Sequence, residues 1–212
     1  MIAGVEEAGR GPVIGPMVMV ILVIDEKDEQ KLVDLGVKDS KLLTATQREE
    51  IYQSLVNFEH HVKILQPNEI DEAVLSEAMN LNWLEAKTTA ELISFVKADK
   101  VILDCPSNNT SAYKNYVKKL LKKDIEIIAE HKADVKYPVV SAASIIAKVT
   151  RDREIEKLKK KFKVNFGSGY PSDPLTISFL EKNYKKYDFF RKSWAPYKKL
   201  LKSTQQKTLK GF

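Results

Sequence analysis

The order of apolar patterns along the chain constrains its fold more than any other feature. Short apolar runs typical of strands open the chain at residues 1–5 and 13–24, and residues 60–65 give a plausible third. Helices are then predicted at residues 44–56, 80–96 and 112–122 and from Pro138 onward, with strands between them at residues 100–104 and 125–129. Strands first, followed by alternating helices and strands, predict a mixed sheet flanked by helices, which is an α/β fold.

Two adjacent carboxylates, Glu6 and Glu7, follow the first strand-like run, and a glycine-bracketed arginine comes directly after them. Successive side chains of a strand point to opposite faces, so the two acids can converge only where the strand ends or bulges, which Gly9 and Gly11 permit. This segment would place metal-binding charge beside a site for a phosphate backbone. A solvated acidic turn is the alternative interpretation.

Two further carboxylates stand where an α/β fold places functional groups. Asp104 ends a buried strand-like run, and Pro106 stops that run. An unpaired buried charge is costly, so such an acid is expected to have a metal, a cation or hydrogen-bond donors beside it. Asp134 precedes Pro138 and a long helical pattern, where it could instead favour the dipole at a helix N-terminus.

Taken together, these segments resemble ribonuclease HII, the type 2 ribonuclease H, and in particular its archaeal forms. The matching motifs comprise residues 4–16, 36–41, 104, 131–134 with 141–148, and 167–174, in the order of the family. The resemblance implies a ribonuclease H-like fold with a mixed five-stranded sheet. It also implies a catalytic domain over residues 1–174 and a short, basic, helical C-terminal region over residues 175–212.

The resemblance implies an endoribonuclease that cleaves the RNA strand of RNA–DNA hybrids. Such an enzyme also nicks duplex DNA at an embedded ribonucleotide and leaves 3′-hydroxyl and 5′-phosphate ends. By the same resemblance, Glu6, Glu7, Asp104 and Asp134 are the catalytic residues and metal ligands. Two divalent ions about 3.5–4 Å apart can activate water and stabilise the charge on the transition state and on the leaving oxygen. Ligands that are all oxygen favour Mg²⁺ or Mn²⁺ over zinc.

Glu6 departs from the family pattern, which has Asp before Glu at the first acidic pair. The extra methylene lengthens the side chain by about one C–C bond, whereas a catalytic site must hold its groups within about half an ångström. This difference puts the activity, the metal preference or both in question.

Recognition of RNA must rest on the 2′-hydroxyl, which distinguishes RNA from DNA at a given site. In the family, the backbone matching Gly9, Arg10 and Gly11 contacts the ribonucleotide and its junction, and a tyrosine matching Tyr170 stacks on the neighbouring deoxyribose. Without the resemblance, Tyr170 would be interpreted as a loop aromatic that holds the neighbouring glycines to the core.

Polar residues after Gly36 are further candidates. Lys38, Ser40 and Lys41 are reasonable phosphate contacts, although a loop that caps a helix would show the same residues. His131 lies near the acids in sequence, and as a lone histidine it is assigned a supporting or structural role.

Positive charge is concentrated at the C-terminal end of the chain. Residues 181–212 hold ten Lys or Arg and two acids, a balance of +8, while the whole chain carries +6, so the preceding 180 residues sum to −2. Aromatic residues are interleaved with these lysines, a combination that suits phosphate contacts together with packing on the main domain. A lysine-rich solvated face, as in proteins from hot environments, is the alternative.

The last residues resemble the short peptide by which replication and repair enzymes bind the sliding clamp. Gln206 is followed at three and six residues by Leu209 and Phe212, so a helical turn would put the two apolar side chains on one side as a plug for an apolar pocket. Gln206 would then hydrogen-bond to nearby backbone. One aromatic residue stands where two are usual, and a frayed terminal helix could show the same pattern.

The remaining features favour a soluble, intracellular protein, and we expect a cytoplasmic monomer. A lone cysteine, Cys105, excludes an internal disulfide, which fits a reducing compartment. No basic leader precedes Glu6, and the apolar run of residues 13–24 is too short for a membrane span and contains Gly15 and Pro16.

Two alternatives from other functional classes stay open. Glu6 could spoil the metal site and leave a protein that binds hybrid duplexes without cutting them. Another nuclease of the same fold, such as a junction resolvase, would cut all-DNA junctions and would need neither the glycine–arginine–glycine turn nor Tyr170. The related ribonuclease HIII normally carries an additional N-terminal domain, for which a first strand at residue 2 leaves no room.

Overall fold

Residues 1–209 are described by a computed structural model, without the side chains of residues 205 and 207–209. The chain forms two units, each built from three separate stretches of sequence. The first unit comprises Met1–Ala8, Val18–Ile64 and Leu81–Arg151, and the second comprises Gly9–Met17, Leu65–Asn80 and the chain from Asp152 onward. The predicted C-terminal region begins within the last of these stretches, and its separation from residues 1–174 as a domain stays a prediction.

A single mixed sheet forms the centre of the first unit. Its described strands are β1 (Ile2–Ala8), β2 (Met17–Ile24), β3 (Glu59–Leu65), β4 (Lys100–Asp104) and β5 (Glu126–Glu130), in the order β3-β2-β1-β4-β5. β1 pairs antiparallel with β2 and parallel with β4, and β4 pairs parallel with β5. The predicted five-stranded mixed sheet is confirmed.

Helices surround the sheet and build most of the second unit. The first unit contains α1 (Glu29–Asp34), α2 (Ala45–Leu55), α4 (Leu81–Ser94), α5 (Thr110–Leu120), α6 (Ala133–Lys136) and the beginning of α7 (Pro138–Phe162). The second unit contains the rest of α7, together with α3 (Pro67–Leu75), α8 (Pro174–Asn183) and α9 (Ala195–Leu209). Short 3₁₀ turns occur at Glu26–Asp28 and Ser40–Leu42. No helix among these described residues has both the length and the apolar character needed to cross a membrane.

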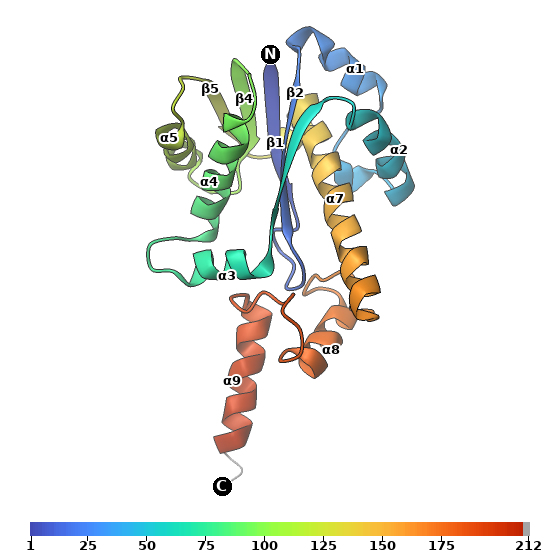
Figure 1. Cartoon of the computed structure of the whole chain (residues 1–212), viewed down its shortest axis with the longest axis vertical. Helices are drawn as coiled ribbons and strands as arrows, with labels where there is room; N and C mark the ends of the chain where they lie inside the picture. The colour runs from blue at the N-terminus through green and yellow to red at the C-terminus, as the bar shows by residue number, and fades with distance from the viewer. Residues whose placement is uncertain (210–212) are drawn as a thin grey trace. The chain divides into compact units, whose positions relative to one another are not determined.

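One face of the sheet packs directly against α7, and Figure 1 shows α7 and α4 on either side of β1. Alternate β2 residues are buried with residues 139–149 of α7; they are Val18, Val20, Leu22 and Ile24. Gly4 of β1 permits this close approach, because a Cβ there would lie 2.5 Å from the main-chain carbon of Val139. Small residues on α7, Ala142 and Ala143, are fully buried in the same core.

β2 begins at Met17, so the prediction of a strand from residue 13 is wrong for residues 13–16. The amides of Val13 and Ile14 donate to the carbonyl of Gly169 and not to a neighbouring strand of the sheet. Gly15 has a φ of +85°, a left-handed conformation that interrupts an extended run. These residues belong to the second unit.

The second unit has an apolar core of its own. Its buried members are Val13, Ile14, Ile155, Phe166, Leu180, Phe189, Phe190 and Tyr197. The aromatic residues of the C-terminal stretch pack on one another there; the rings of Tyr187 and Phe189, for example, stack at a centroid distance of 4.8 Å. The interleaved aromatics noted in the sequence therefore build a core rather than a row of exposed rings.

Candidate metal site and substrate-binding turn

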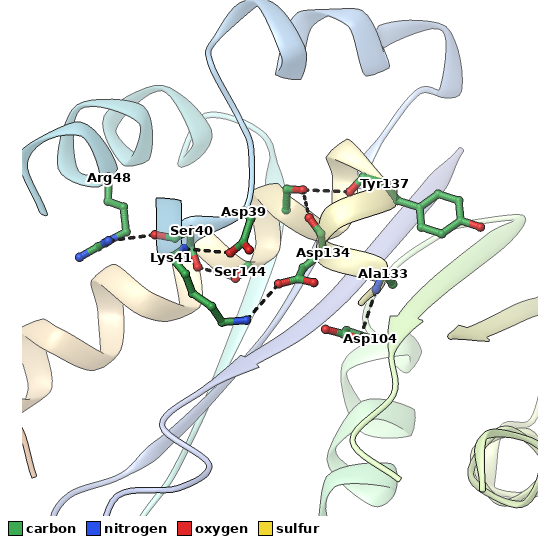
Figure 2. Close-up of polar contacts among 10 residues, drawn as sticks. Asp39, Ser40, Lys41, Arg48, Asp104, Ala133, Asp134, Tyr137 and Ser144 are labelled. Atoms are coloured by element: carbon green, nitrogen blue, oxygen red, sulfur yellow. Dashed lines mark hydrogen bonds and ion pairs between the residues drawn. The ribbon is translucent and has the colours of Figure 1, made fainter. Parts of the chain in front are cut away.

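Three carboxylates from separate parts of the first unit come together. Glu6 belongs to β1, Asp104 to β4 and Asp134 to α6. One carboxylate oxygen from each lies within 4.8 Å of those of the other two, and Figure 2 shows Asp104 and Asp134 close to one another. Glu6 and Asp134 are buried, and Asp104 is half-buried. The structure therefore brings together three of the four predicted acids.

Parallel pairing of β1 and β4 places Glu6 and Asp104 beside one another. Val5 lies opposite Leu103, so Glu6 and Asp104 are the next residues toward the carboxyl ends of the two strands. Both point to the face that carries Gly4, because side chains alternate along a strand. In α/β sheets, ligands bind at the carboxyl ends of the strands.

The turn after β5 carries Asp134 to this site. Lys132 has a φ of 58°, a left-handed conformation that is uncommon for a residue with a side chain. Beyond it, the Ala133 N–H donates to Oδ1 of Asp104 at 3.3 Å, and the Lys132 N–H donates to the same carboxylate. The Ser141 hydroxyl of α7 donates to the main-chain carbonyl of Asp134, so the turn is fixed from both sides.

Burial and mutual repulsion favour the protonated form of two of these acids. The pKa of Glu6 is raised well above its ordinary value, first by burial and then by the negative charges of Glu7, Asp104 and Asp134. The pKa of Asp104 is raised by burial and then by Asp134, although two main-chain N–H groups oppose the shift. A cation bound among the three carboxylates would relieve this repulsion.

The donor set fits a divalent cation. Oε2 of Glu6 is buried and has no hydrogen-bond partner among the described residues. A buried carboxylate oxygen in that situation is costly unless a cation lies beside it. Every ligand atom that the group offers is a carboxylate oxygen, the type that Mg²⁺ and Mn²⁺ prefer. Glu6 reaches the group despite its additional methylene.

Lys41 adds a positive charge at the edge of the carboxylate group. Its Nζ lies 3.4 Å from Oδ2 of Asp134, and the Lys41 side chain is 76% exposed whereas that of Asp134 is 4% exposed. Burial lowers the pKa of Lys41, but the charges of Asp134 and Asp39 outweigh that effect and raise it. One end of this ion pair is therefore open to solvent and to a polyanionic ligand.

The loop that carries Lys41 is held by a cap and by a buried serine pair (Figure 2). Oδ1 of Asp39 accepts a hydrogen bond from the Lys41 amide at 2.9 Å. The hydroxyl oxygens of Ser40 and Ser144 are 2.9 Å apart and buried. Lys38 is exposed. These contacts support a structural role for Ser40 and leave Lys38 and Lys41 as cations on the surface.

Glu7 lies outside the carboxylate group that the described residues form. The sequence allowed Glu6 and Glu7 to converge through a strand end or a bulge, but β1 pairs regularly with β2 through Ala8. Glu7 consequently points to the other face of the sheet, where burial and then the charge of Glu7 raise the pKa of Tyr113. Its role as a metal ligand stays a prediction.

His131 contacts the main chain rather than the acids. Its Nδ1 lies 3.0 Å from the carbonyl oxygen of Cys105. The histidine is exposed and is absent from the carboxylate group found among the described residues. This contact supports the structural role assigned to it from the sequence.

In the second unit, the glycine–arginine–glycine turn lies against Tyr170. Gly9 has a φ of +83°, which residues with a side chain rarely adopt. A Cβ on Gly11 would lie 3.7 Å from Cε1 of Tyr170, so the ring lies beside the turn. The Gly169 carbonyl accepts a hydrogen bond from the Val13 amide at 2.9 Å, which ties the two loops together. The structure thus joins the predicted substrate-binding residues of this unit.

Two residues that hold this turn are missing from the sequence prediction. Arg191 is fully buried and donates to three main-chain carbonyls within residues 9–15, and Trp194 donates to that of Gly11. In the sequence, both stand only as members of a basic, aromatic stretch. Any residue can offer a main-chain carbonyl as a hydrogen-bond acceptor. The contacts of Arg191 and Trp194 therefore leave no motif in the sequence.

The predicted clamp-binding residues lie at the end of the described chain. Gln206 belongs to α9 and is exposed. The side chain of Leu209 and the whole of Phe212 lie outside the described residues. Binding of a sliding clamp through these residues stays a prediction.

Known proteins resemble this chain over most of its length. A model of the family described as Ribonuclease HII matches residues 3–197. The ribonuclease HII of Pyrococcus horikoshii is 49% identical over 207 residues, which cover 94% of this chain and 92% of that protein. The crystal structure of ribonuclease H2 from Pyrococcus horikoshii OT3 matches with a TM-score of 0.86 at 46% identity and covers 96% of this chain and 98% of its own. A chain in the structure of the PCNA:RNase HII complex from Archaeoglobus fulgidus matches with a TM-score of 0.85 at 38% identity, covering 94% and 96%.

Proposed function

Because the chain belongs to the ribonuclease HII family, we propose that its carboxylate group is the catalytic centre of a ribonuclease H. The protein is an endoribonuclease that hydrolyses the RNA strand of RNA–DNA hybrids. We infer that it also nicks duplex DNA on the 5′ side of an embedded ribonucleotide and leaves 3′-hydroxyl and 5′-phosphate ends. The observation that carries the assignment of the centre is the buried Oε2 of Glu6, which lacks a hydrogen-bond partner among the described residues and belongs to the group with Asp104 and Asp134.

Glu6, Asp104 and Asp134 would hold the metal, and Glu7 is the fourth acid of the family pattern. When bound, two Mg²⁺ or Mn²⁺ ions supply an activated water and stabilise the charge on the attacking and leaving oxygens of the phosphodiester. Asp104 accepts hydrogen bonds from two main-chain N–H groups, and these bonds fix the orientation of its carboxylate without a bound metal. Lys41 balances part of the negative charge, and its exposed ammonium can contact a phosphate of the substrate.

The turn at residues 9–11 and the ring of Tyr170 form the proposed ribonucleotide-binding surface. Amides in a glycine-rich turn can approach a sugar or phosphate closely, because no Cβ stands in the way. Tyr170 can stack on the neighbouring deoxyribose, which would favour an RNA-to-DNA step. Lys38 and Lys41 are the proposed phosphate contacts of the neighbouring loop, and the buried Ser40 holds that loop in place.

A sliding clamp is the proposed protein partner. The ribonuclease HII of Archaeoglobus fulgidus is known in a complex with PCNA, and the C-terminal residues Gln206, Leu209 and Phe212 have the spacing of a clamp-binding peptide. We propose that the enzyme acts as a monomer in the cytoplasm, where an archaeal-type repair enzyme meets chromosomal DNA.

A nicking assay tests this function. A labelled DNA duplex with one ribonucleotide and the identical all-DNA duplex are incubated with Mg²⁺, with Mn²⁺ and with a chelator. Cleavage is expected only in the ribonucleotide duplex with metal, with a 3′ end that a polymerase extends. Binding without a nick would indicate a hybrid-binding protein, and cleavage of all-DNA junctions would indicate another nuclease.

A further inference from the structure

The guanidinium of Arg191 contacts one segment of the chain with all three of its nitrogens. Nε donates to the carbonyl of Gly15 at 2.9 Å, Nη1 to that of Arg10 at 2.9 Å and Nη2 to that of Gly9 at 2.6 Å. Arg191 is fully buried, and its bonds to the carbonyls of Gly15 and Gly9 are protected from water. Arginine side chains are rarely buried completely unless their donors are paired. Here the pairing is with the carbonyls of a surface turn.

We propose that Arg191 is a positioning residue that sets the orientation of the peptide groups in the turn at residues 9–11 and thereby the recognition of ribose. The inference rests on the proposed function of that turn and adds the residue that shapes it. Arg191 acts through the turn and is given no contact with the substrate.

The planar geometry of the peptide group links each held carbonyl to the direction of the next N–H. In a trans peptide, the carbonyl and the following N–H belong to one plane and point in opposite directions, and the described residues contain no cis peptide. Holding the Gly9 carbonyl toward Arg191 therefore turns the Arg10 N–H away from it, and holding the Arg10 carbonyl turns the Gly11 N–H away. The guanidinium thus fixes the direction of two consecutive amides.

Gly11 completes the arrangement. Its carbonyl accepts a hydrogen bond from Nε1 of Trp194 at 3.1 Å, and Arg191 stacks over the Trp194 ring with Cζ 4.8 Å from its centroid. Gly11 is exposed, and its N–H donates no hydrogen bond within the described part of the chain. All three carbonyls of the turn are held by Arg191 and Trp194, while the Gly11 amide stays available to a sugar hydroxyl or a phosphate.

The main chain at Arg191 is fixed from both sides. Its own N–H donates to the carbonyl of Val13 at 2.8 Å. Asp71 of α3 accepts the amides of Lys192 and Ser193, each at 2.8 Å, and the Ser193 hydroxyl. Asp71 is nearly buried, and its carboxylate holds the backbone that presents the guanidinium. Asp71 therefore fixes the backbone of residues 191–193, and Arg191 in turn fixes carbonyls of the turn at residues 9–11.

Lysine cannot replace this arginine. A guanidinium presents its donors in a rigid planar fork, whereas an ammonium is a point charge whose donors radiate from one nitrogen. Arg191→Lys keeps the charge but loses the simultaneous contact with carbonyls of three residues. Trp194→Phe keeps a ring beside the arginine and removes one donor, and Asp71→Asn retains the shape of the carboxylate while weakening its hold on two amides.

The test is the preference for ribose, measured separately from stability. Fluorescence anisotropy gives the affinity for a DNA duplex with one ribonucleotide and for the identical all-DNA duplex, with Ca²⁺ in place of Mg²⁺ and a gel to verify that the duplex stays intact. The wild-type chain should prefer the ribonucleotide duplex. In Arg191→Lys the ratio of the two affinities should fall on the order of tenfold, with affinity for the all-DNA duplex nearly unchanged.

Leu180→Ala serves as the matched control, because it lowers the melting temperature by removing core volume from the same unit. Its affinity ratio should equal that of the wild type. A wild-type ratio in Arg191→Lys would overturn the inference and leave the proposed function standing, whereas a wild-type chain without any preference would overturn the proposed function of the turn and the inference with it. If Arg191→Lys does not fold, Trp194→Phe and Asp71→Asn decide: reduced ratios support the inference, and wild-type ratios in both refute it.

Discussion

Nζ of Lys41 lies 3.4 Å from Oδ2 of Asp134, so an exposed ammonium pairs with a buried carboxylate. This cation offsets part of the repulsion among the three acids, yet Glu6 and Asp104 keep raised pKa values. The group is therefore short of positive charge. Metal ions and protons compete for it, and this competition determines several properties that can be measured.

Replacing Asp104 by Asn should abolish nicking. The Asn oxygen can still accept the Ala133 amide that Asp104 accepts at 3.3 Å, so the turn is expected to hold, but a neutral amide is a poor metal ligand. Metal ions contribute several kcal/mol to such a reaction, so turnover should fall by at least about a thousandfold. Melting temperature and hybrid binding, measured in parallel, should stay close to wild type. Turnover at the wild-type rate would refute the metal-centre assignment.

Glu6→Asp should raise turnover, and more with Mg²⁺ than with Mn²⁺. Mg²⁺ demands near-ideal octahedral geometry, so it tolerates a misplaced ligand less well. Steady-state nicking rates with each ion compare the two proteins. A variant no faster than the parent would mean that the backbone of β1 already compensates for the longer side chain.

Glu6→Gln should stabilise the metal-free protein near neutral pH. The raised pKa of Glu6 means that the folded chain holds this proton more tightly than the unfolded chain does. Its contribution to the free energy of unfolding is therefore fully present below the ordinary pKa of Glu and is lost as the pH rises through the raised value. Thermal melts from pH 4 to pH 8 should fall less steeply for Glu6→Gln, with a gain of about 2–4 °C for each kcal/mol recovered. Parallel pH profiles for the two proteins would contradict the raised pKa.

Gly4→Ala should destabilise the first unit and weaken its metal site together. The added Cβ would lie 2.5 Å from the Val139 main-chain carbon, and backbone cannot rotate away as a side chain can. Overpacking of this kind costs about 1–3 kcal/mol, which denaturant titration can measure. The shift of β1 against α7 should also move Glu6 and lower the affinity for Mn²⁺. Gly36→Ala is a useful comparison, because the nearest atom there is a side-chain methyl at 3.9 Å and any effect comes from its φ of +79°.

Deleting residues 206–212 should abolish binding to the sliding clamp without changing nicking. Gln206 is exposed on α9, and the deletion leaves the aromatic core of the second unit intact. Isothermal calorimetry with the clamp of the same organism measures the affinity, and the ribonucleotide nicking assay is the control. Undiminished clamp affinity after the deletion would refute the assignment of this peptide.

The three acids of the candidate metal site could be picked out because each lies next to a regular apolar pattern in the sequence. Glu6 and Asp104 close apolar strand patterns, and parallel strands end at the same edge of a sheet. Asp134 precedes the long helix that begins at Pro138. In these cases both the carboxylate side chain and its place beside a strand or helix pattern can be read from the sequence.

The orientation of Glu7 and the contacts of Arg191 depend on tertiary structure and not on the local sequence. The face to which Glu7 points depends on whether β1 stays regular through Ala8, and the glycines that follow allowed either outcome. Arg191 acts on main-chain carbonyls far away in sequence, so its role follows from tertiary structure alone. The predicted start of β2 is wrong for the same reason, since the amides of Val13 and Ile14 donate to the carbonyl of Gly169.

The hydrogen bond between Arg191 and Gly9 spans 182 positions of the chain. A ribosome delivers the N-terminal end first, so the nascent polypeptide carries Glu6, Asp104 and Asp134 well before the arginine that shapes the turn has been added. On the role proposed for Arg191, ribose recognition is consequently among the last properties to be completed during synthesis. A product that terminates early, after Asp134 but before Arg191, would carry its three acids without the residue proposed to orient the ribose-binding turn.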